Sequence, residues 1–277
     1  MQQTNGGRGI RIASASQVAF AVTMIALGIL GLIRGKFTPI WQPVPKSMPA
    51  RGVLTFLCVA IPLASGIGLL WQRTSAAAAR VLLIYLLLWL LAMRVPLIFI
   101  SPTVDVWWAG CQTAVMTGAA WVLYTWFARD WDRRYFKFAT GENGMRIARA
   151  LFGLALIPFG VAHFIYLKVT ADLVPDWLPA HVGWAYFTGY TFIAAGLAIV
   201  IGIYARLAAM LATLQMGLFT LLVWIPILAA GANASQWAEF IVSWALTAAA
   251  WVVTNSYDDV PWLSLGKSRT RLFRNQT

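Results

Sequence analysis

The chain has 277 residues, of which 60% are hydrophobic and only 11% are charged. Soluble domains carry roughly 25% charged residues, and a soluble fold of this length could not hide so much apolar surface. The composition therefore excludes an ordinary soluble protein and indicates an integral membrane protein, whose apolar surface faces lipid. The net charge of +12 does not indicate nucleic-acid binding, because the basic residues lie between apolar segments and form no single patch.

Eight apolar segments are long enough to be membrane spans, since a helix needs about 20 residues to cross ~30 Å of hydrocarbon. They cover residues 15–34, 53–71, 81–100, 109–128, 149–168, 184–203, 207–229 and 238–255. Each is predicted to be a helix, because an open strand would leave backbone groups unpaired in lipid. The predicted fold class is all-α, a polytopic membrane protein of about eight transmembrane helices.

The distribution of Lys and Arg predicts the orientation of the chain. With alternating spans, fifteen of the 21 basic residues fall on the side of the two termini and five on the other side. Cytoplasmic loops carry such an excess. We therefore expect both termini in the cytoplasm, with a bacterial inner membrane as the location.

The sequence matches itself when it is shifted by 130 residues. Coincident Pro, Gly and Trp residues at one offset are far more specific than coincident Leu residues in so apolar a chain. The matched pairs include Pro45 with Pro175, Pro49 with Pro179, Gly66 with Gly196, Pro96 with Pro226, Trp107 with Trp237 and Trp121 with Trp251. This pattern predicts a first four-helix unit (residues 1–135), a second (residues 136–260) and a basic tail (residues 261–277). Two units of four spans enter the membrane in the same direction, as parallel repeats do.

Three motifs in the second unit carry a family resemblance. They are G-x-x-H-F at 160–164, V-P-x-W-L-P at 174–179 and A-R-x-A-A at 205–209. With them, residues 146–254 resemble the DoxX-like family of four-helix membrane proteins. The first unit is similar only weakly, with Arg34 where the family pattern has the histidine found here at His163. The resemblance implies a membrane-embedded four-helix unit and, more remotely, a link to quinone-coupled redox assemblies such as thiosulfate:quinone oxidoreductases.

Five ionisable residues are candidates for a site in the outer leaflet: Arg94, His163, His181, Glu239 and Arg34. Arg94 lies within the third span, where it is either a donor to an anion or quinone carbonyl, or a side chain that snorkels to the interface. The two histidines are expected at one depth, as a proton relay, a quinone-binding pair or metal ligands. The alternative for each is a buried histidine bonded to the backbone. Glu239 is expected at a helix N-terminus, where the dipole stabilises it, or paired with an arginine.

No Cys or carboxylate lies close enough in sequence to the histidines to complete a metal site, so none is predicted. Three functions remain. The chain is a membrane subunit that holds quinone and meets a membrane or periplasmic redox partner, a transporter of a small molecule or lipid, or a scaffold without a site. The first predicts an outer cavity lined by Arg94 and His163, the second a cavity between the units, and the third tightly packed bundles.

Overall fold

The computed structural model of the protein describes residues 14–265, and the basic residues of the predicted tail, from Lys267 onward, lie outside this range. Within it the fold is all-α and contains no β-strand. The long helices are α1 (Ala15–Arg34), α2 (Arg51–Leu70), α3 (Gln72–Leu88), α5 (Val104–Phe127), α7 (Gly141–Ile165), α9 (His181–Ile201), α10 (Ala205–Leu218) and α12 (Ala234–Asn255). Shorter helices are η1 (Pro39–Trp41), α4 (Val95–Ile100), α6 (Asp130–Tyr135), α8 (Leu167–Asp172) and α11 (Ile225–Ala229).

Seven helical segments of the described chain are long and apolar enough to cross a membrane, which makes this a polytopic membrane protein. Two of them are composite: Gln72–Ile100 joins α3 to α4, and Ala205–Ala229 joins α10 to α11. The remaining predicted span, residues 109–128, corresponds to α5, a helix of 24 residues that is less apolar than the other seven. Most of α5 is buried against other helices, including Gln112, Thr113 and Thr117, so its surface need not match lipid.

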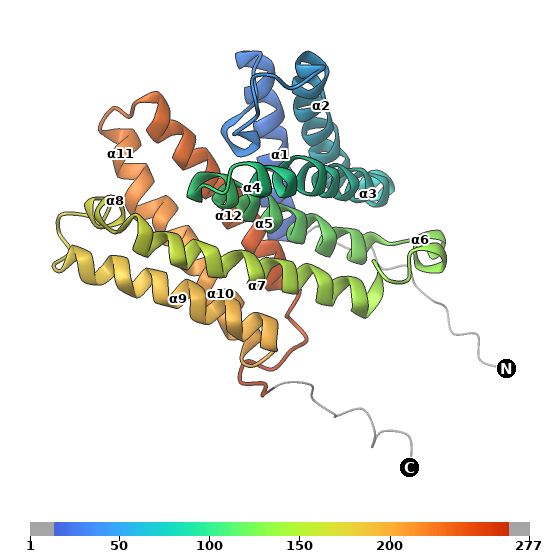
Figure 1. Ribbon diagram of the computed structural model, residues 1–277. Coiled ribbons are helices and arrows are strands. Elements are labelled where there is room, and N and C mark those ends of the chain that lie inside the picture. The colour runs from blue at the N-terminus through green and yellow to red at the C-terminus, as the bar shows by residue number, and fades with distance from the viewer. Residues whose placement is uncertain (1–13, 266–277) are drawn as a thin grey trace, which may run out of the picture.

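The helices form two bundles that share a central interface. Figure 1 shows α1 beside α2 in one bundle and α7 beside α9 in the other, and these are also the most extensively packed pairs. Between the bundles, α5 packs on α7, α12 packs on α1, and α5 packs on α12. The last helix of each half thus contacts the first helix of the other half, as a two-fold arrangement requires.

The same local irregularities recur at the sequence offset of 130 residues. Each of the two composite spans contains a π-helical segment, η2 (Trp89–Arg94) and η3 (Phe219–Trp224), and each segment is followed two residues later by proline. Proline cannot donate a helical hydrogen bond, and a π-bulge is one way to accommodate the break. A left-handed alanine precedes α2 and α9 at equivalent positions, Ala50 (φ 53°) and Ala180 (φ 57°).

Glycine pairs set the close approach of α7 and α9. A Cβ added to Gly160 would lie 2.3 Å from the carbonyl oxygen of Gly189, and one added to Gly196 would lie 2.6 Å from that of Gly153. Both obstacles are backbone atoms, which cannot rotate away. Small residues at such crossings let membrane helices pack in van der Waals contact.

We expect the substitution Gly160→Ala to destabilise the second bundle by about 1–3 kcal/mol, because the added methyl group forces α7 and α9 apart. Thermal unfolding of the purified protein in detergent measures the effect. The control is Gly183→Ala in α9, where the added Cβ meets only the Ala180 side chain at 3.6 Å. Equal melting temperatures for the two variants would contradict the packing argument.

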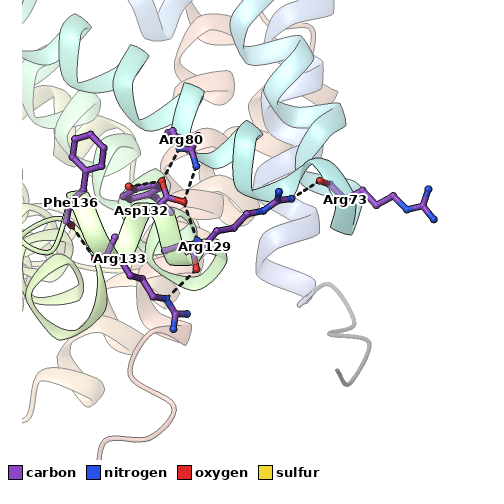
Figure 2. A network of polar contacts seen from close by, with 9 residues as sticks. Arg73, Arg80, Arg129, Asp132, Arg133 and Phe136 are labelled. Carbon is purple, nitrogen blue, oxygen red and sulfur yellow. Dashed lines mark hydrogen bonds and ion pairs between the residues drawn. The ribbon is translucent and has the colours of Figure 1, made fainter. Parts of the chain in front are cut away.

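A buried carboxylate fixes the linker between the two units. Asp132 in α6 is completely buried and accepts two hydrogen bonds of 2.8 Å from Arg80 of α3. It also accepts bonds of 3.0 Å from the Tyr124 hydroxyl and from the Arg129 backbone N–H. Figure 2 shows Asp132 between Arg80 and Arg129, with Arg129 reaching the carbonyl oxygen of Arg73. The start of the linker is therefore tied to the first bundle.

Candidate functional site

Arg94 forms the largest polar cluster in the interior of the first unit. Its side chain is 1% exposed and donates to the carbonyl oxygens of Gln42 (2.8 Å), Pro43 (2.9 Å) and Ile40 (3.3 Å). Its Nε also donates to the Thr113 hydroxyl at 3.2 Å. The side chain therefore does not snorkel to the interface. It holds the 40–43 segment on the bundle with Ile40 and Trp41 buried, and it contacts no carboxylate within the described residues.

The held segment fills the core of the first unit with aromatic rings. Trp41 is 1% exposed, and its ring lies 5.3 Å from Tyr85 and 5.7 Å from Trp89, both in edge-to-face orientation. The Tyr85 hydroxyl donates to the Cys58 sulfur at 3.1 Å. Edge-to-face pairs are favourable packing geometries for aromatic rings.

The second unit contains a cavity of about 1640 Å³, which we call the second-unit cavity. Helices α7, α9, α10 and α12 contribute most of its wall, and α5 and the 39–43 segment close one edge. Five lining residues are Thr188, Gln215, Phe219, Trp224 and Ser243.

The two units differ in what occupies this place. Shifted back by 130 residues, those five lining positions fall on the residues that surround the 40–43 segment of the first unit: Cys58, Tyr85, Trp89, Arg94 and Thr113. The position equivalent to Trp41 is Ala171. The first unit is thus filled by its own chain at the place where the second unit is open.

His163 is held rigidly in the wall of the second-unit cavity. It lies in the last turn of α7, is 7% exposed, and contacts the Phe159 carbonyl oxygen through Nδ1 at 2.7 Å. Its ring stacks on Phe219 at 5.9 Å and on Trp108 at 6.4 Å between ring centroids. Among residues 14–265 nothing is bonded to Nε2, which is the ring nitrogen left to the cavity.

Gln112 adds a second free polar group to the same wall. It lies one helical turn after Trp108 on α5, so both side chains are on the same face of that helix. Gln112 is 8% exposed and lines the cavity, and its side-chain amide has no bonding partner within the described chain. The amide is therefore left to bond a ligand or water in the cavity.

The polar groups on α9 and α10 are bonded to each other. Thr191 donates to the side-chain oxygen of Gln215 at 2.5 Å, and Gln215 donates to the Thr188 carbonyl oxygen at 3.0 Å. The Thr188 hydroxyl donates to the Trp184 carbonyl oxygen at 2.9 Å. These hydroxyl hydrogens are used inside the protein, so the threonines present lone pairs to the cavity.

The other predicted site residues divide between the cavity and its surroundings. Glu239 and Arg34 both line the cavity, and within residues 14–265 no ion pair reaches either side chain, so the alternative in which Glu239 pairs with an arginine is not seen. Glu239 also lies in the second turn of α12, which Asn233 caps, and is therefore not the N-terminal residue expected. Arg94 and His181 do not line the cavity.

Comparison with known proteins finds no matching family model, no matching curated protein and no matching solved structure. The assignment of a functional site therefore depends on the geometry of the cavity alone. That geometry is a large apolar cavity with a few convergent polar groups, which is typical of a ligand-binding site. Three or more metal-ligating side chains do not come together anywhere in the described residues.

Proposed function

We propose that this protein binds an amphipathic aromatic molecule of the quinone class in its second-unit cavity, as the membrane subunit of a quinone-linked redox assembly. The observation that carries the proposal is that two polar groups without a partner in residues 14–265, His163 Nε2 and the Gln112 amide, line the cavity beside aromatic rings. A flat ring with polar substituents fits such a wall, since aromatic faces favour stacking and the polar groups favour hydrogen bonding.

The size of the cavity supports a ligand with a tail. Pockets for drug-sized molecules measure about 300–1,000 Å³, and this cavity is larger, at about 1640 Å³. Leu211, Leu214 and Leu222 of the α10–α11 span extend the lining on an apolar side. A head group at His163 leaves room there for an isoprenoid or alkyl chain.

The other two functions fit the cavity less well. A scaffold needs neither a large cavity nor free polar groups in its wall. A transporter built from parallel repeats is expected to hold its substrate between the repeats, whereas this cavity lies mainly within the second unit. We further propose that the two units are diverged copies of one DoxX-like unit, that both termini face the cytoplasm of a bacterial inner membrane, and that a redox partner meets the opposite side.

The test is an analysis of total quinone, the oxidised and the hydroquinone form together, in the protein purified in mild detergent. We expect the wild-type protein to retain quinone, and the variant His163→Ala to retain at least about tenfold less, because it loses one hydrogen bond and the ring stack. The matched control is His181→Ala, because His181 does not line the cavity. Absence of quinone from the wild-type protein, or equal retention in a folded His163→Ala variant, would contradict the proposal.

A further inference from the structure

The direction of one hydrogen bond restricts what the second-unit cavity can bind, and this inference rests on the proposed function. The Phe159 carbonyl oxygen carries no hydrogen, so the 2.7 Å contact to His163 Nδ1 requires that Nδ1 carries the proton. In a neutral imidazole the other nitrogen, Nε2, is then an acceptor. Burial of the ring among Trp108, Phe192 and Phe219 favours the uncharged form.

We infer that the second-unit cavity binds its ligand in the hydroxylic form, a hydroquinone or phenol that donates a hydrogen bond to His163 Nε2, in preference to the quinone. A quinone oxygen facing Nε2 would bring two acceptors together with no hydrogen between them. A hydroquinone places an O–H group there and stacks equally well on the surrounding rings.

The two threonines of α9 and Gln112 do not cancel this preference. The Thr188 and Thr191 hydroxyl hydrogens are bonded to oxygen atoms of the protein, so both side chains present further acceptors. Gln112 carries both a donor and an acceptor and suits either form of the ligand. Selection therefore arises at His163, where the backbone fixes the direction of the bond.

A pair of redox-inert probes isolates the O–H group: 4-nonylphenol and its methyl ether, 4-nonylanisole. They share the ring and the tail, so only the hydrogen-bond donor differs. A phenol must lose water to enter an apolar cavity, so without an acceptor the ether should bind at least as tightly. Binding is followed by intrinsic tryptophan fluorescence in lipid nanodiscs, with empty nanodiscs as the partition reference.

With an acceptor at His163, we expect wild-type protein to bind the phenol about five- to tenfold more tightly than the ether. His163→Phe keeps an aromatic ring but removes the acceptor, and the preference should disappear. His181→Phe is the matched control and should keep the full preference.

Each alternative result has a distinct meaning. Equal binding of the two probes to wild-type protein, or a preference that survives in His163→Phe, overturns this inference and leaves the proposed function standing. Failure of both probes to bind wild-type protein overturns the inference and the proposed aromatic-ligand site together.

Discussion

The substitution Arg94→Ala is expected to lower the free energy of unfolding by about 3 kcal/mol, because it leaves one buried and two partly buried carbonyl oxygens without a donor. Those oxygens belong to Ile40, Gln42 and Pro43, and each loses the bond that Arg94 supplies from η2, the segment between α3 and α4. The 40–43 segment should then leave the core, and the rings around Trp41 should lose their packing.

Thermal or SDS-induced unfolding of the purified protein measures this loss. Arg34→Ala is the matched control, because Arg34 is exposed and forms no bond or ion pair within the described chain. The variant Arg94→Lys should be intermediate, since one ammonium group cannot reach all of these oxygens at once. An Arg94→Ala protein as stable as wild type would show that the 40–43 segment holds its place without this side chain.

The second large effect is expected for Asp132→Asn, which should destabilise the protein by about 2–3 kcal/mol at neutral pH. Removing one partner of a fully buried ion pair costs ~3–5 kcal/mol, but the Arg80 side chain is 34% exposed and water can solvate it when it is released. Tyr124 and the Arg129 N–H bond different oxygens of the carboxylate, and the single side-chain oxygen of asparagine can replace only one of them. The loss therefore reports on the charge and on one hydrogen bond.

The pH dependence of that difference follows from the pKa of Asp132. Burial acts to raise this pKa, but the hydrogen bonds from Arg80, the Arg129 backbone and Tyr124 outweigh burial and leave the pKa below its usual value. A carboxylate with a lowered folded-state pKa stabilises the fold above its unfolded pKa of about 3.9, and this stabilisation is lost as the pH falls through the folded pKa.

The free energy of unfolding, measured from pH 7 to pH 3, should therefore differ between wild type and Asp132→Asn by a constant amount down to about pH 4. Below that pH the difference should shrink. Asp130→Asn is the matched control, because Asp130 is in the same short helix and makes no ion pair within residues 14–265. A gap that widens on acidification would mean that Asp132 is not charged in the folded protein.

Apolar runs of the sequence predicted the positions of most helices well. The segment 15–34 coincides with α1, and the two boundaries of the segment 184–203 lie within three residues of those of α9. The start of α9 was placed too late because His181 and Val182 follow a left-handed alanine, which no hydrophobic pattern reveals. The π-helical segments were likewise not predicted, although the prolines after them indicated a break in each helix.

The candidate site was only partly predictable. The resemblance motif indicated His163, which does line the cavity. The role of Arg94 could not be read from its own surroundings in sequence, because its partners are backbone oxygens more than fifty residues earlier. Gln112 and Gln215 were overlooked, yet each is a polar amide in a long apolar segment, and this signal was present in the sequence.

The unequal filling of the two units has a mechanical consequence. In the first unit, Arg94 and the rings around Trp41 occupy the interior beside α5. The Ala205–Ala229 span is the least buried of the seven apolar spans and forms one wall of the open unit. A ligand that enters the proposed site from the lipid would therefore displace the least protein packing at this span.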